Sequence, residues 1–176
     1  RPEGKEIETN RDYLFLYDGA EIYIPKNGVY DTSRFELGFE DNELKVVADH
    51  VALRRDFQIK INAPDSIDGH YLGVKSKKGK IRFVSNTIRD NQFIAKTKKT
   101  GIYSVAQDTI PPSIKPAQQY DQRWLSNFKT LRFTIDDRET GISSYHATID
   151  GKWALFEYEP KKKELTFNFD EYFTLK

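Results

Sequence analysis

The chain contains no cysteine and no methionine. Without cysteine it can form no disulfide, no thiolate metal site and no cysteine nucleophile. Because an initiator methionine is also missing, we expect the chain to be a fragment or a processed product. Any targeting segment is then expected upstream of Arg1.

Long apolar runs and net charge are also scarce. No window approaches the roughly 20 apolar residues of a membrane-spanning helix, so no membrane span is expected. The 28 Lys+Arg residues nearly balance the 27 Asp+Glu residues, whereas nucleic-acid binding usually requires a clustered basic face. We therefore expect no nucleic-acid partner, and the sequence predicts no particular oligomeric state.

Short alternating apolar and polar runs dominate what is present. Phe57, Ile59 and Ile61 share one face of such a run. Dipeptides suited to tight hairpin turns, such as Asp18-Gly19 and Asp150-Gly151, separate neighbouring runs. The runs recur about every ten residues, and no segment keeps a helical period, so we predict an all-β chain of two tandem immunoglobulin-like β-sandwich domains.

A proline-rich stretch predicts the boundary between the domains. Residues 108–116 read Asp-Thr-Ile-Pro-Pro-Ser-Ile-Lys-Pro. The three prolines remove backbone donors and favour extended geometry at the preceding residues, which is typical of a stiff connector. The predicted division is an N-terminal β-sandwich (1–107), a connector (108–117) and an immunoglobulin-like β-domain (118–176).

The second domain is predicted to be incomplete. We expect four strands after the connector, whereas an immunoglobulin-like sandwich has about seven. The run 142–149 is predicted to be one of these strands, and Trp153 and Leu155 in the next run are predicted to lie in the core. Two explanations stay open: the native chain continues, which we favour because Phe173 and Leu175 suggest a further strand, or the module is small and leans on the first.

Residues 101–114 resemble the junction between two β-sandwich units in a family of exported Bacteroidetes proteins, and residues 131–137, 141–145 and 149–153 carry the same resemblance. In that family, such C-terminal β-domains follow a zinc endopeptidase domain of the lysostaphin/LytM type, which cleaves peptidoglycan cross-links. The resemblance implies a periplasmic or cell-surface location and a catalytic domain outside this chain.

The zinc ligands of that family match only in part. Its active site combines a His-x-x-x-Asp element with a later His-x-His element. His146 and Asp150 fit the first spacing, but His146 is the last histidine, and a catalytic zinc needs three protein ligands. We therefore expect no catalytic residue, no metal site and no cofactor in this fragment, with His50 and His70 as surface or turn residues.

Two further groups are candidate binding sites. Carboxylates can hold calcium at one end of the second domain, although the same residues also suit a polar turn: Asp136, Asp137, Glu139 and Asp150. Trp124 and Tyr120, in a polar segment after the connector, are candidates for an aromatic platform that stacks on sugar rings.

These observations predict a non-catalytic accessory region of an exported cell-envelope protein. It would position a peptidoglycan endopeptidase domain or dock it to a cell-wall or envelope protein partner. The alternatives are a stand-alone carbohydrate-binding or adhesion module, and a fragment that itself hydrolyses a substrate.

Overall fold

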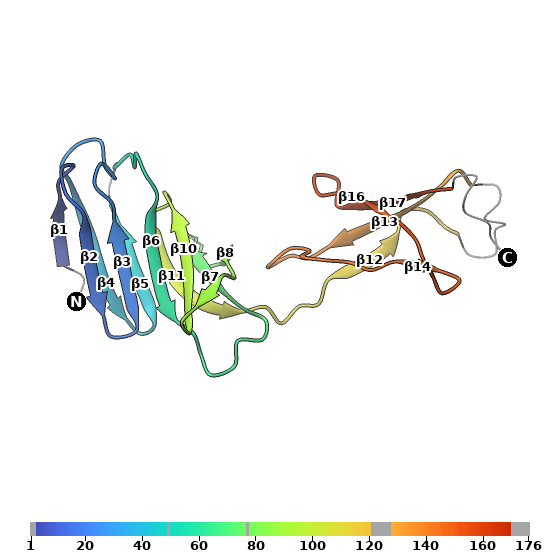
Figure 1. The fold of residues 1–176 in the computed structure, drawn as a ribbon, viewed down its shortest axis with the longest axis horizontal. Helices are drawn as coiled ribbons and strands as arrows, with labels where there is room; N and C mark the ends of the chain where they lie inside the picture. Colours follow the sequence, from blue (N-terminus) through green and yellow to red (C-terminus); the bar gives the residue numbers. More distant parts are fainter. Residues whose placement is uncertain (1–2, 49, 77, 121–127, 170–176) are drawn as a thin grey trace. The chain divides into compact units, whose positions relative to one another are not determined.

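The computed structural model describes residues 3–48, 50–76, 78–120 and 128–169. These residues form antiparallel strands and turns and no helix (Figure 1), so the predicted all-β class is confirmed. Within this described part, no helix is long and apolar enough to cross a membrane. The chain divides into two compact units, Arg1–Thr109 and Ile110–Lys176.

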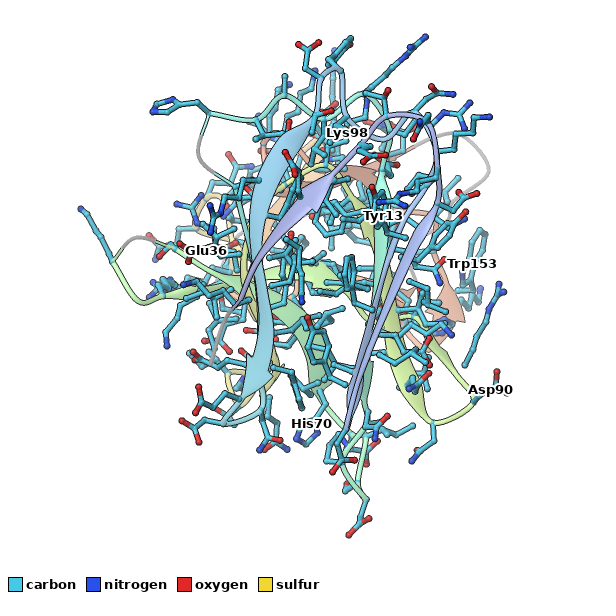
Figure 2. All side chains as sticks on the ribbon, turned by 90° about the vertical axis from the view of Figure 1, so that its left-hand side faces the viewer. Tyr13, Glu36, His70, Asp90, Lys98 and Trp153 are labelled. Carbon is cyan, nitrogen blue, oxygen red and sulfur yellow. The ribbon has the colours of Figure 1, made fainter. Side chains whose placement is uncertain are left out.

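The first unit is built from two antiparallel sheets (Figures 1 and 2). In spatial order, the first sheet contains β1 (Glu3–Ile7), β4 (Ser33–Glu40), β5 (Glu43–Val47), β11 (Gly101–Gln107), β7 (His70–Lys75) and β8 (Ile81–Ser85). The second contains β2 (Tyr13–Tyr17), β3 (Ala20–Ile24), β6 (Phe57–Asn62), β10 (Gln92–Thr97) and β9 (Ile88–Arg89). Side chains fill the space between the two sheets, as expected of a β-sandwich.

The alternation of the strands places their apolar side chains in one shared core. On β6, Phe57, Ile59 and Ile61 are buried, as predicted, while the residues between them are partly exposed. On β3, directly beside it, Ile22 pairs with Ile59 and is also buried. Each fully buried side chain of this size contributes about 1.5–3 kcal/mol to the stability of the unit.

Tight turns with Asp and Asn fix the register of the hairpins. Asp41 and Asn42 join β4 to β5 and both have positive φ (53° and 59°). Asp90 and Asn91 do the same between β9 and β10 (50° and 58°). Asp and Asn tolerate this conformation because their short polar side chains stabilise it locally.

Tyr103 on β11 is the largest side chain that is fully buried. Its ring meets that of Phe57 edge-on, with centroids 6.4 Å apart and planes at 83°. Its hydroxyl donates a hydrogen bond to the carbonyl oxygen of Lys99. Burial disfavours the phenolate and raises the pKa of Tyr103 to about 12.

We predict that this tyrosine makes the first unit sensitive to alkali. The pKa of Tyr103 in the folded state lies above that of an unfolded tyrosine, which is about 10. The contribution of the protonated Tyr103 to the stability of the first unit is therefore complete below pH 10 and is lost as the pH rises towards 12. Between about pH 8 and about pH 11.5, the free energy of unfolding of the wild type should fall on the order of 2 kcal/mol further than that of Tyr103→Phe. Urea unfolding followed by circular dichroism measures this difference.

Tyr30→Phe is the matched control, because Tyr30 is 62% exposed. It should retain the alkaline loss of the wild type. At neutral pH, Tyr103→Phe should itself be about 1 kcal/mol less stable, because it lacks the hydrogen bond to Lys99. An identical pH dependence in wild type and Tyr103→Phe would contradict the assignment.

The described residues of the second unit form one four-stranded sheet and one hairpin. In spatial order, the sheet consists of β12 (Ser113–Pro116), β13 (Thr130–Asp136), β17 (Glu164–Asn168) and β16 (Glu157–Glu159), and the hairpin of β14 (Thr148–Ile149) and β15 (Lys152–Trp153). Its core is aromatic: Phe156 lies 5.9 Å from Phe133 and 5.2 Å from Phe167, measured between ring centroids. This cluster is separate from the core of the first unit.

The connector predicted over residues 108–117 is wrong in its second half. Ser113–Pro116 form the edge strand β12, in which Ile114 pairs with Ile135 and Pro116 with Phe133. An edge strand needs hydrogen bonds on one side only, so a proline that lacks an N–H is tolerated there. The structure places the boundary between the units at Thr109 and Ile110.

The strand predicted over residues 142–149 is also wrong. Only Thr148–Ile149 form a strand, and it pairs with Lys152–Trp153 rather than with the four-stranded sheet. The hairpin instead packs Ala147 and Ile149 into the core of the second unit. The alternating apolar residues of this run therefore pack against the four-stranded sheet, but the run is not a strand of that sheet.

Candidate functional site

The hairpin of the second unit has two chemically different faces. Thr148 pairs with Trp153, and the backbone N–H of Ala154 donates to the carbonyl oxygen of Ala147 (3.0 Å). Alternation along both strands directs one set of side chains inward. This inward set consists of Ala147, Ile149, Ala154 and Phe156.

The opposite set forms the outer hairpin face, defined here as His146, Thr148, Trp153 and Leu155. Thr148 pairs with Trp153, and the hydrogen bond between Ala154 and Ala147 continues that register, so by alternation His146 and Leu155 fall on the same face. All four are exposed, and Trp153 and Leu155 are 64% and 61% exposed. Figure 2 labels Trp153 among the side chains. The prediction that Trp153 and Leu155 lie in the core is therefore wrong. Both faces of the run contain apolar residues, so alternation alone could not show which face is buried.

The Tyr145 side chain joins the two arms of this hairpin. The Tyr145 hydroxyl donates to the carbonyl oxygen of Phe156 (2.5 Å). The Tyr145 ring also meets that of Tyr158 edge-on, with centroids 6.1 Å apart. These contacts and the burial of Phe156 fix the backbone on which Trp153 is presented.

Of the aromatic pair predicted from the sequence, the structure describes only Tyr120. Trp124 lies outside the residues that the structure describes. Tyr120 is half-buried; its hydroxyl accepts from the N–H of Arg132 (2.7 Å) and donates to the carbonyl oxygen of Arg132 (3.3 Å). Its ring also packs against Phe128 and Phe133, at centroid distances of 5.3 and 5.9 Å. Tyr120 is therefore attached to β13 both by its hydroxyl group and by its ring.

The candidate calcium ligands have separate roles. Asp136 Oδ1 accepts from the Lys163 ammonium (2.5 Å). Asp137 Oδ1 accepts from three successive backbone N–H groups, those of Glu139, Thr140 and Gly141 (2.9–3.1 Å). Asp150 occupies the hairpin turn with φ of 51°. Asp136 is therefore paired with the Lys163 ammonium, and Asp137 stabilises the turn at residues 139–141.

The three histidines are dispersed. His146 is exposed on the outer hairpin face, and His50 is an exposed turn residue with φ of 55°. His70 begins β7, and its Nδ1 lies 3.0 Å from the carbonyl oxygen of Asp68, so Nδ1 must donate. Among the described residues, no three His, Asp or Glu side chains form a group that could hold a metal ion.

One end of the first sandwich is hollowed between the two sheets. The hollow, about 380 Å³ in volume, has Phe39, Ile61 and Val105 among its apolar lining and Asp18 and His70 among its polar lining. The volume falls within the range of small-ligand sites. No sequence pattern pointed to this hollow, because Phe39, Ile61 and Val105 come from three strands that are far apart in the chain.

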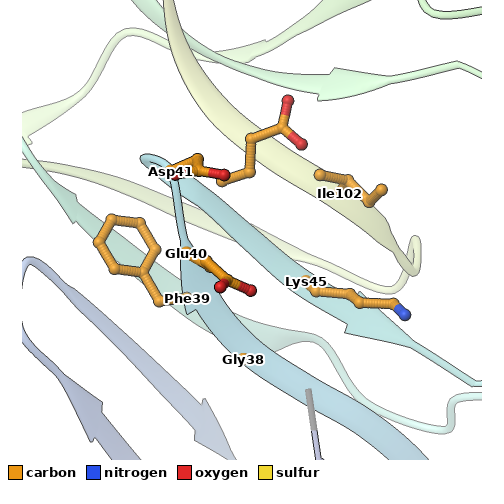
Figure 3. A pocket seen from close by; sticks show the side chains of 7 residues that line it. Gly38, Phe39, Glu40, Asp41, Lys45 and Ile102 are labelled. Atoms are coloured by element: carbon orange, nitrogen blue, oxygen red, sulfur yellow. The ribbon is translucent and has the colours of Figure 1, made fainter. Parts of the chain in front are cut away.

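A second, smaller hollow lies beside the turn between β4 and β5 (Figure 3). Glu40, Asp41 and Lys45 border it together with the apolar Ile102. The Lys45 ammonium already donates to Glu36 (2.5 Å) and lowers the pKa of that carboxyl. Lys45 therefore takes part in an exposed ion pair on the sheet surface.

The edge strand β2 exposes apolar side chains that the sequence analysis did not single out. Leu14 and Leu16 are 58% and 68% exposed, and Tyr23, which pairs with Leu14, is 39% exposed. The Tyr23 hydroxyl donates to Asp12 (2.7 Å). A backbone hydrogen bond from Lys26, followed by the one from Tyr23, lowers the pKa of Asp12. Exposed leucines on an edge strand are typical of contact surfaces.

No protein-family model matches the chain, and neither a curated protein nor a solved structure matches it significantly. The functional argument therefore rests on the surfaces of the two units and on the chemistry of their side chains.

Proposed function

We propose that this chain is a non-catalytic accessory region of an exported cell-envelope protein. In this role the two β-units position a peptidoglycan metalloendopeptidase domain and dock it to the cell wall or to an envelope protein. The location and the endopeptidase partner come from the resemblance of residues 101–114, 131–137, 141–145 and 149–153 described above.

The observation that carries this proposal is the tandem arrangement of two separately cored β-units. Phe57 and Tyr103 belong to one apolar cluster, and Phe133 and Phe156 belong to the other. A unit with its own core can keep its shape whatever its neighbour does. Such units suit the task of spacing and presenting another domain.

Exposed apolar side chains add a means of docking. Leu14 and Leu16 project from the first unit, and Trp153 and Leu155 project from the second. At exposed positions of a half-buried strand, polar residues are usual. Their apolar character supports a role in contact with another molecule.

A sedimentation assay with purified peptidoglycan sacculi tests the proposal. The isolated chain should sediment with the sacculi and should release no soluble fragments, with or without added zinc. A β-domain of similar size that does not bind peptidoglycan serves as the control for trapping in the pellet.

Release of soluble fragments that requires zinc and is abolished by His146→Ala would overturn the non-catalytic role. Failure to sediment with sacculi, combined with failure to bind any envelope protein in the same fraction, would overturn the docking role.

A further inference from the structure

The outer hairpin face is a small, mixed surface of one aromatic, one aliphatic and two polar side chains. Within the described residues, the structure gives no hydrogen bond for the Trp153 indole, the Thr148 hydroxyl or the His146 imidazole. These groups are therefore able to bond to a ligand without breaking an existing contact. The indole of Trp153 is 64% exposed, so its ring is open to a stacking partner.

We propose that the outer hairpin face binds a neutral pyranose ring of a glycan strand, with the ring stacked on Trp153. This inference rests on the proposed docking role and assigns a ligand class to it. Thr148 and His146 supply hydrogen bonds to the sugar hydroxyls, and Leu155 extends the apolar floor beside the indole.

The chemistry of the four side chains matches a sugar ring. One side of a pyranose presents C–H groups, which pack on an aromatic face, while its edge presents hydroxyls that both donate and accept. The Thr148 hydroxyl also donates and accepts, and a neutral imidazole does so through its two nitrogens. An amphipathic ligand of this kind needs the apolar and polar groups side by side, as the register of Thr148 and Trp153 places them.

The size of the face favours a small ring over a protein partner. Side chains directly opposite in a hairpin lie roughly 5 Å apart, and same-face neighbours along a strand lie roughly 7 Å apart. The four side chains thus cover an area close to that of one sugar ring. A stable protein interface buries about 1,600 Å² in total, whereas a single aromatic side chain offers only about 150–250 Å².

The backbone that carries the face is held by a buried neighbour and a hydrogen bond. Trp153 is flanked by the buried Ala154, and Tyr145 ties the hairpin to the carbonyl of Phe156. A preorganised backbone loses little freedom when a ligand binds. The exposed indole is therefore supported by residues that do not themselves need to touch the ligand.

Isothermal titration of the isolated chain with chitotetraose and with cellotetraose tests the inference. The wild type should show saturable binding of at least one of these neutral oligosaccharides. Trp153→Ala should raise the Kd at least about tenfold, while Trp153→Phe, which keeps an aromatic face, should retain part of the affinity. Thr148→Val, which keeps the shape but removes the hydroxyl, should weaken binding to an intermediate extent.

Tyr30→Ala is the matched control, because Tyr30 is a similarly exposed aromatic residue (62%) in the first unit. Its affinity should equal that of the wild type. Because Trp153 is outside the core, the circular dichroism spectrum of Trp153→Ala should also equal that of the wild type.

Binding that survives Trp153→Ala would overturn the inference, and so would the absence of saturable binding to both oligosaccharides. If the chain still sediments with sacculi in either case, the docking role stands and belongs to another surface. Zinc-dependent cleavage of sacculi would overturn the proposed non-catalytic function, but it would not contradict glycan binding by the outer hairpin face.

Discussion

Phe57→Ala is expected to unfold the first unit at much lower denaturant while leaving the unfolding of the second unit unchanged. Phe57 has no exposed surface, and its ring contacts that of Tyr103. Replacing a buried phenylalanine with alanine costs about 3–5 kcal/mol, because burial is lost and a cavity remains. That loss is a large share of the stability of a single domain.

Two spectroscopic signals separate the units. Both tryptophans, Trp124 and Trp153, belong to the second unit. Tryptophan fluorescence therefore reports on that unit alone, whereas far-ultraviolet circular dichroism reports on the strands of both. In Phe57→Ala, the dichroism should show an early transition that the fluorescence does not show.

Leu16→Ala provides the control for this prediction. Leu16 is an apolar residue of the same unit but is 68% exposed, so its truncation should change the stability by less than about 0.5 kcal/mol. If fluorescence and dichroism shift together in Phe57→Ala, the two units unfold as one cooperative body, and the independence of their cores is refuted.

Phe156→Ala is expected to have the reverse effect, with the second unit lost and the first retained. Phe156 is buried between the rings of Phe133 and Phe167. The expected cost is again about 3–5 kcal/mol. Because small domains bury a smaller fraction of their surface and are marginally stable, this loss should leave the second unit largely unfolded without denaturant. Urea unfolding followed by circular dichroism should then show the transition of the first unit and no separate transition for the second.

Leu155→Ala is a closely matched control for Phe156→Ala. The two residues are adjacent, but Leu155 points to the opposite face and is 61% exposed. Leu155→Ala should keep the unfolding transition of the second unit. Equal destabilisation by the two substitutions would show that the hairpin has been assigned the wrong inward face.

The first unit could be predicted well from the sequence, because local patterns and tertiary packing agree there. Phe57, Ile59 and Ile61 alternate with polar residues, and the same alternation is seen in their burial. The turn at Asp41 and Asn42 has the positive φ values that these residues favour. Period and turn chemistry are properties of short segments, so neighbouring strands were not needed to recognise them.

The second unit was predicted less well, because its apolar residues lie on both faces of the same run. Trp153 and Leu155 alternate in the same way as Ala154 and Phe156, yet only the second pair is buried. Pro116 suggested a connector but lies in an edge strand. In both cases the answer depends on which surface the segment meets, and that surface is made by residues distant in the chain.

The candidate site shows the same limit. Tyr120 was proposed as a ligand-binding residue, but its hydroxyl bonds to the backbone of Arg132 and its ring packs on Phe133. For Asp136 and Asp137 the sequence left a calcium site and a polar turn open; in the structure, Asp136 bonds to Lys163 and Asp137 to backbone N–H groups of a turn. Residue type indicates which bonds a side chain can make, whereas the fold decides which partner it meets.

By itself, therefore, the amino-acid sequence determined that the chain is all-β, where several of its tight turns lie and which residues form the first core. These features follow from the two-residue period of a strand and the backbone preferences of Asp, Asn and Gly. Only the tertiary structure decided that Ala154 and Phe156 face inward and that Trp153 is exposed. The physical reason is that a side chain is buried only where two surfaces meet. A single strand supplies one of these surfaces, and residues distant in the sequence supply the other.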